Sequence, residues 1–178
     1  MQNPNPDFLI RPLVPSDRDR VRAFVIQRWG AEIAVAHHVV YRPHQLPGFA
    51  AWQSESIVGL VTLHVVGNSC EIVTIDSLQP GRGMGTALLD AAIAFARQAN
   101  CTRLWLITTN DNLNALRFYQ KRGLVLVTIH RNALTRSRQL KPQIPLIGND
   151  GIPLRDEIEL EMVLEIDNEG FNNLKVRG

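Results

Sequence analysis

The sequence has few of the features that mark specialised protein classes. Its 178 residues include only two cysteines, Cys70 and Cys101, which are too few for a disulfide framework or a cysteine-based zinc site. It contains no apolar run of the roughly 18 residues that a membrane-spanning helix needs. The first residues also lack the basic and apolar regions of a signal peptide. We therefore expect a cytoplasmic protein in a reducing compartment, without membrane contact.

An excess of charge of one sign is also missing. The chain has 19 Lys and Arg residues against 17 Asp and Glu residues, a formal net charge of +2. Nucleic-acid-binding domains usually carry a strongly basic footprint, so we do not expect a nucleic-acid partner. The hydrophobic fraction of 45% is that of an average globular protein with a buried core.

The hydrophobic patterning predicts one α/β domain over residues 8–166, with flexible termini at 1–7 and 167–178. A helix is expected to begin at Ser16, because Ser16 and Asp19 resemble a capping box. Residues 31–47 show no clear pattern. The other expected helices cover 86–99, 112–122 and 133–140. The expected strands cover 8–13, 48–53, 57–66, 70–78, 103–108, 124–130 and 156–164. The connections among the second, third and fourth strands are too short for parallel crossovers, so these strands pair antiparallel.

A glycine-rich turn lies between a strand and a helix, with the sequence Gly81-Arg82-Gly83-Met84-Gly85-Thr86. Glycines permit positive φ and let a ligand approach the backbone. The N–H groups of a helix start attract an anion such as a pyrophosphate, and Arg82 would add a charge-assisted contact. The alternative is a tight turn that serves helix–strand packing, because the spacing fits neither a Walker A loop nor a dinucleotide fingerprint.

The helix over 112–122 presents an unusual face. Asn112, Ala115, Leu116 and Tyr119 are spaced to lie on one side, and Asn110 or Asn112 suits the helix start. An amide, a gap and a phenol could together border a ligand. The alternative is that Tyr119 is a core aromatic.

Together, these two segments and the order of elements resemble the GNAT superfamily of acyl-CoA-dependent N-acetyltransferases. The resemblance covers about residues 8–130, and its specific motifs lie between Ile72 and Leu124. It implies a GNAT-like mixed α/β fold: a central, mostly antiparallel sheet with splayed strands and helices on both faces. Two positions depart from the family pattern: Pro80 replaces a frequent Arg or Gln, and Leu124 replaces a usual Phe.

The resemblance also implies roles for individual residues. The turn would hold the CoA pyrophosphate, the strand before it would pair with the pantetheine arm, and Asn112 would contact the same arm. Tyr119 would protonate the departing thiolate. The implied cofactor-binding residues are Ile75, Asp76, Ser77, Gly81, Arg82, Gly83, Met84, Gly85, Thr86, Asn110, Asn112 and Ala115.

The expected reaction is direct attack of a primary amine on acetyl-CoA, which serves as co-substrate. The general base is expected on the strand before the turn, with Glu71 favoured over Asp76. A regular strand points these two acids to opposite faces, so only one faces the acceptor unless a bulge intervenes. The alternative function is a non-catalytic acyl-CoA sensor or interaction module. A homodimer is left open.

The remaining polar clusters carry weaker expectations. His37, His38 and His44 lack a cysteine or carboxylate framework, so we expect no metal site. Glu157, Glu159 and Glu161 are expected to form a solvated strand face. The basic segment 131–141 is expected to be solvated, with the alternative that it borders the acceptor site.

Overall fold

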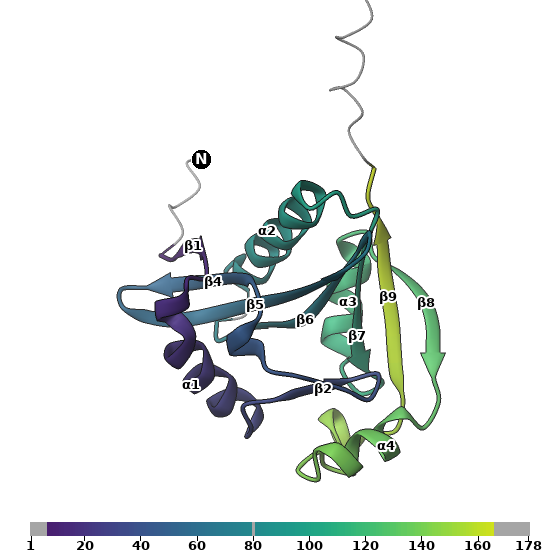
Figure 1. Ribbon diagram of the computed structural model, residues 1–178. Coiled ribbons are helices and arrows are strands. Elements are labelled where there is room, and N and C mark those ends of the chain that lie inside the picture. Colours follow the sequence, from purple (N-terminus) through teal and green to yellow (C-terminus); the bar gives the residue numbers. More distant parts are fainter. Residues whose placement is uncertain (1–6, 80, 166–178) are drawn as a thin grey trace, which may run out of the picture.

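A seven-stranded sheet forms the centre of the computed structural model, which describes residues 7–79 and 81–165 (Figure 1). Its order is β1-β4-β5-β6-β7-β9-β8, and only β6 and β7 pair parallel. The strands are β1 (Leu9–Pro12), β4 (Gly48–Gln53), β5 (Ser56–Val66), β6 (Ser69–Ser77), β7 (Arg103–Thr109), β8 (Val125–His130) and β9 (Glu157–Val163). The prediction of a mixed, mostly antiparallel sheet is confirmed.

Helices cover both faces of the sheet, as predicted. They are α1 (Arg18–Trp29), α2 (Met84–Gln98), α3 (Leu113–Lys121) and α4 (Ala133–Leu140). On one face, α2 buries Leu88, Leu89 and Ala92 in the larger core, which also holds Tyr119 of α3. On the other face, α1 buries Val21 and Phe24 in a second core. Apolar residues at helical spacing account for both contacts.

The unpatterned segment 31–47 forms a small hairpin of β2 (Ala34–Ala36) and β3 (Val39–Tyr41). Its turn consists of His37 and His38, both with positive φ, at 47° and 64°. The hairpin lies on the α1 side of the sheet, where β2 lies against β6 and α4 (Figure 1).

The start of α1 differs from the prediction. The Ser16–Asp19 capping box is wrong, because the helix begins at Arg18 after a short 3-10 turn. The acid at this turn is Asp17, whose carboxylate accepts the Val14 N–H at 3.0 Å. Arg11 also donates to it at 2.7 and 2.9 Å, and this pairing lowers the pKa of Asp17.

The expected solvated face of β9 is also wrong. Glu157 is 2% exposed and Glu159 is 9% exposed. The tip of the β2–β3 hairpin and α4 cover this face: His37 contacts both acids, and Ser137 of α4 reaches Glu157. These contacts come from segments far from β9 in sequence, so strand alternation alone could not indicate them.

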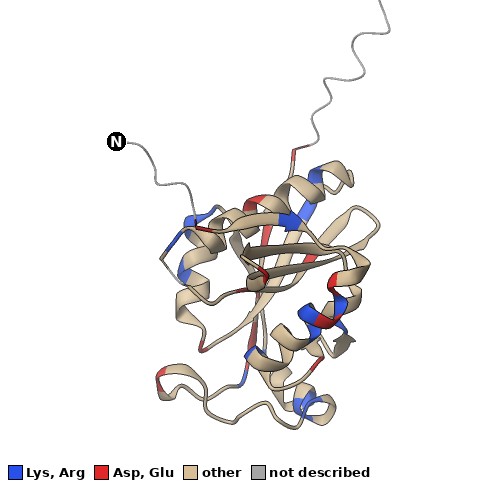
Figure 2. Cartoon of the chain, turned by 90° about the vertical axis from the view of Figure 1, so that its left-hand side faces the viewer, with Lys and Arg blue, Asp and Glu red and all other residues tan. Residues whose placement is uncertain are grey.

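Charges are distributed without a dominant sign in the view of Figure 2, where basic and acidic positions intermingle. The described helices are all too short or too polar to cross a bilayer. The predicted flexible termini fall almost entirely outside the described residues, as does Pro80.

Candidate active site

The sheet opens where its two parallel strands diverge. The β6–β7 ladder runs from Ser69↔Arg103 to Ile72↔Leu106. Both strands continue beyond it, β6 to Ser77 and β7 to Thr109. Within the described residues, β6 and β7 pair over these four positions and no further. The backbone groups of residues 73–77 that face β7 therefore lie along a gap between the two strands. A linear ligand can pair with such an open strand edge.

A bulge in β6 decides which way its acids point. The register passes from Thr62↔Thr74 to Leu63↔Ile72, which leaves Val73 as an extra residue. One inserted residue reverses the alternation that follows. Glu71 and Asp76 therefore lie on the same face, and the separation expected for a regular strand does not occur.

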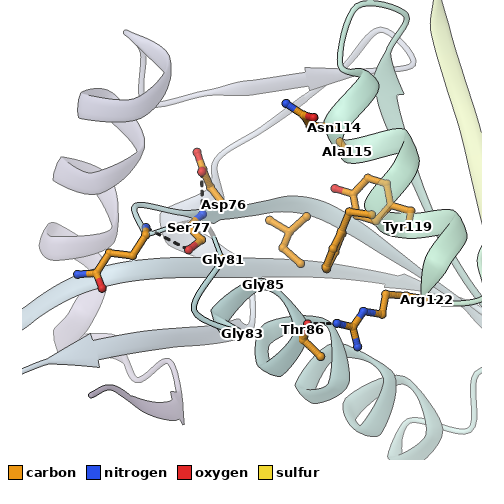
Figure 3. A pocket seen from close by; sticks show the side chains of 13 residues that line it. Asp76, Ser77, Gly81, Gly83, Gly85, Thr86, Asn114, Ala115, Tyr119 and Arg122 are labelled. Atoms are coloured by element: carbon orange, nitrogen blue, oxygen red, sulfur yellow. Dashed lines mark hydrogen bonds between the residues drawn. The ribbon is translucent and has the colours of Figure 1, made fainter. Parts of the chain in front are cut away.

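A first cavity of about 580 Å³ lies on the α2 and α3 side of this gap (Figure 3). It extends from the glycine-rich turn to the inner face of α3. Its lining residues are Ile75, Asp76, Ser77, Gln79, Gly81, Gly83, Gly85, Thr86, Asn114, Ala115, Phe118, Tyr119 and Arg122. Most of the residues that the sequence assigned to the cofactor are therefore brought together here.

The turn at this cavity is open rather than packed. Gly81 and Gly83 have φ of 83° and 80°, and apart from the glycine itself and its chain neighbours no atom lies within 4 Å of where a Cβ would stand on either residue. Gly83 immediately precedes α2, whose first N–H groups have no intrahelical acceptors. Exposed amides at the positive end of a helix dipole form an anion site.

Three side chains around the turn point in different directions. Arg82 points toward Asp7, at 3.6 Å, and does not line the cavity. The Met84 side chain is buried, and its sulfur accepts the Ser77 hydroxyl at 3.3 Å. The cation beside the turn is Arg122, which donates to the Thr86 hydroxyl and lines the cavity. Arg122 was missed, although it stands one helical turn after Tyr119.

A second cavity of about 660 Å³ lies on the opposite side, beneath α1, the hairpin and α4. Its polar lining includes Thr74, Asn112, Lys141 and Glu157. The two cavities share Ile75, Asp76 and Tyr119, so these residues stand where the cavities meet. Lys141, at the end of the basic segment, lines this cavity, as does Glu157, which was expected on a solvated strand face.

Tyr119 is held in a defined position at this junction. Its side chain is 7% exposed, and Phe118 packs against it edge to face with ring centroids 5.4 Å apart. Burial, together with the nearby charge of Asp76, raises the pKa of Tyr119. The phenol therefore keeps its proton at neutral pH. In Figure 3 its oxygen points into the cavity.

The two acids of β6 have different surroundings. Glu71 is 4% exposed, accepts the Tyr41 hydroxyl at 2.7 Å and lines neither of the two cavities. Burial raises the pKa of Glu71, against the opposing effects of Tyr41 and His64. Asp76 lines both cavities and receives two hydrogen bonds from Arg28, at 2.8 and 3.0 Å.

The two asparagines are separated by the start of α3. Asn112 caps the helix by accepting the Ala115 N–H at 3.3 Å, and it lines the second cavity. Asn110 lines neither cavity, because its side chain binds the chain at Pro153, Arg155 and Asp156. Asn114, which the sequence did not single out, lines the first cavity instead.

Comparisons with known proteins agree with this geometry. Residues 15–124 match the acetyltransferase (GNAT) family. The uncharacterized protein YdhI of Bacillus subtilis (strain 168) is 41% identical over 143 residues, which cover 80% of this chain and 89% of YdhI.

Two solved structures share the fold. An IAA acetyltransferase from Bacillus cereus ATCC 14579 superposes with a TM-score of 0.68 at 23% identity, over 88% of this chain and 99% of that one. A Bacillus subtilis acetyltransferase in complex with CoA gives a TM-score of 0.62 at 19% identity, over 89% and 99%.

Proposed function

This chain belongs to the acetyltransferase (GNAT) family, and from that premise we propose that it transfers an acetyl group from acetyl-CoA to a primary amine by direct attack. The observation that carries the proposal is the position of Tyr119, a buried phenol at the junction of two cavities on opposite sides of the sheet. A donor can then enter from one side and an acceptor from the other.

The first cavity suits acetyl-CoA. Its volume lies in the range of small-molecule sites. The open amides around Gly83 and the guanidinium of Arg122 provide the positive potential that a diphosphate requires. The unpaired edge of β6 at residues 75–77 can hydrogen-bond the amides of the pantetheine arm. The similar CoA-bound acetyltransferase supports the same assignment.

The second cavity suits an amine. Asp76 and Glu157 contribute carboxylates to its lining, beside the cations Arg28 and Lys141, so the lining is balanced in charge and offers carboxylate oxygens that can accept hydrogen bonds from an amine. The apolar residues Trp29, Ala34 and Val35 line another part of it. This pattern favours an acceptor that joins an ammonium group to an apolar body.

The residues at the junction divide the proton transfers between them. Acetyl-CoA supplies the thioester carbonyl that the amine attacks. Tyr119 holds its proton and donates it to the thiolate that leaves. Glu71 is our candidate for the general base. Because Glu71 lines neither cavity, the ammonium proton would reach it through a hydrogen-bonded relay that ends at the Tyr41 hydroxyl, the group that donates to Glu71. Asp76 is the alternative, since it lines the cavity directly.

The test is a thiol-release assay with the full chain, acetyl-CoA and a panel of aliphatic and aromatic primary amines, with mass spectrometry of the products. The proposal predicts stoichiometric release of CoA and a mass increase of one acetyl group on the accepted amine. The corresponding hydroxyl compounds, in which OH replaces the NH2 group, serve as controls and should remain unmodified. Tight acetyl-CoA binding with no turnover of any amine would favour a non-catalytic acyl-CoA sensor instead.

A further inference from the structure

A cluster of two histidines and one glutamate joins the tip of the β2–β3 hairpin to β8 and β9. The Nε2 atoms of His130 and His37 lie 2.9 and 3.5 Å from the Oε2 atom of Glu159. The two imidazole rings meet edge to face, with centroids 4.2 Å apart. One donor atom from each residue lies within 4.8 Å of the other two. None of the three lines either cavity described above.

We propose that His37, His130 and Glu159 form a binding site for one divalent metal ion of the zinc class. Two imidazole nitrogens and one carboxylate oxygen are a donor set that zinc accepts, with the fourth position left to water or another ligand. Tetrahedral ligands at zinc's usual bond lengths lie roughly 3.4 Å apart. The two separations from Glu159 are already close to that value, and the two imidazole donor atoms, which lie within 4.8 Å of each other, would move together on binding an ion.

The surroundings of Glu159 prepare it as a ligand. Arg103 binds the Oε1 atom of Glu159, which leaves Oε2 directed at the two imidazoles. Arg103 is itself held by Glu161 at 2.6 Å. Such outer contacts orient ligating carboxylates in metal sites.

The hairpin turn provides an independent argument. A two-residue hairpin turn with both residues at positive φ normally contains Asn-Gly or Asp-Gly. Here it contains His37 and His38, at φ of 47° and 64°. Residues held in this region carry a conformational cost that is typical of functional sites. A hydrogen bond from the His37 N–H to Glu157, at 3.3 Å, holds the turn against β9, next to Glu159.

An ion at this position would connect the hairpin to the sheet. The hairpin supplies Ala34, Val35 and Ala36 to the second cavity. It also carries Tyr41, which donates to Glu71. The metal would therefore stiffen one wall of the second cavity, a consequence that does not depend on the identity of the acceptor.

The experiment uses the full chain without an affinity tag, dialysed against EDTA and then against metal-free buffer. Calorimetric titration with Zn²⁺ should show one ion bound per chain. Zn²⁺ at about 100 times its Kd should raise Tm by roughly 5–10 °C. Co²⁺ should give visible absorption bands typical of nitrogen and oxygen ligands in a low-symmetry site. Absence of one-to-one binding would overturn the proposal.

Substitutions distinguish Zn²⁺ binding at this site from nonspecific Zn²⁺ binding to surface histidines. His37→Asn and His130→Gln should each weaken Zn²⁺ binding by more than the roughly 10–100-fold that loss of a supporting contact costs. His38→Asn is the matched control, because it changes the neighbouring residue of the same turn, and Asn tolerates positive φ. Its affinity should stay within about twofold of the parent. Equal losses in His38→Asn and His37→Asn would contradict the site, and far-ultraviolet circular dichroism confirms that each variant is folded.

Discussion

At the scale of single residues, local sequence indicated the phenol but not its surroundings. Tyr119 was identifiable because its spacing from Asn112 and Ala115 defines one helix face. The position of Arg122 beside the turn could not be predicted, because it depends on where α3 packs against α2. Asn110 and Asn112 could not be separated for a similar reason: Asn110 is engaged by a loop some 45 residues away.

Kinetic measurements can decide whether Glu71 or Asp76 of β6 acts as the general base. If Glu71 is the base, activity requires its ionised form, so kcat/KM falls as the pH drops through its raised pKa. Glu71→Gln should remove this acidic limb and lower kcat about 10²–10⁴-fold. The pH–rate profiles of Glu71→Gln and Asp76→Asn decide the matter. An acidic limb that survives in Glu71→Gln but disappears in Asp76→Asn would assign the role to Asp76.

Substitutions of Arg122 and Arg82, the two arginines near the turn, should differ in their effect on acetyl-CoA affinity. Arg122→Gln removes the cation that lines the first cavity, and a charged hydrogen bond contributes about 1.5–3 kcal/mol. The Kd for acetyl-CoA, measured by calorimetry, should rise about 10–100-fold. Arg82→Gln is the control, because Arg82 is exposed and faces Asp7. A larger loss in Arg82→Gln than in Arg122→Gln would refute this assignment.

At the scale of elements, periodicity found the long helices and strands to within a residue or two of their ends. The strands of segment 31–47 could not be predicted, because β2 and β3 have three residues each, too few to establish alternation. The start of α1 was misjudged because Asp17, rather than Ser16, hydrogen-bonds the preceding backbone. Both misses concern short elements whose positions depend on tertiary contacts.

The glycine-rich turn can be tested with a matched pair of substitutions. Gly83 and Gly30 both have positive φ, at 80° and 70°, with open space where a Cβ would be. Gly83→Ala and Gly30→Ala should therefore each cost about 1–2 kcal/mol of stability in urea denaturation. Only Gly83→Ala should also weaken acetyl-CoA binding, because its methyl group stands where the diphosphate approaches. Equal acetyl-CoA affinity in the two variants would show that the turn does not hold the cofactor.

At the scale of the whole molecule, the mixed sheet followed from the order of elements together with the family resemblance. The burial of Glu157 and Glu159 could not be predicted in this way, because their alternation along β9 is that of a solvated strand, yet the hairpin and α4 cover them. The second cavity could not be predicted from the sequence either, because residues of α1, β2, α4 and β9 come together to line it. These features arise from contacts between distant segments, which no local pattern encodes.

Ligand binding should stabilise the entire fold. The first cavity contacts β6, α2 and α3, so its occupant bridges three elements. Acetyl-CoA at about 100 times its Kd adds roughly 2.7 kcal/mol, which corresponds to a Tm increase of about 5–10 °C. NAD and ATP at the same concentration should leave Tm within about 1 °C, because the pocket has no counterpart of their binding motifs. A comparable shift with ATP would indicate a general nucleotide site.

The central claim is that the hydroxyl of Tyr119 protonates the thiolate that leaves acetyl-CoA. Tyr119→Phe removes only this oxygen, and the ring can still fill its buried position. The claim is tested by measuring kcat and the Kd for acetyl-CoA of this variant beside the parent enzyme. We predict that kcat falls about 10²–10⁴-fold while Kd changes less than about threefold. An unchanged kcat, or a loss that appears entirely in Kd, would contradict the account.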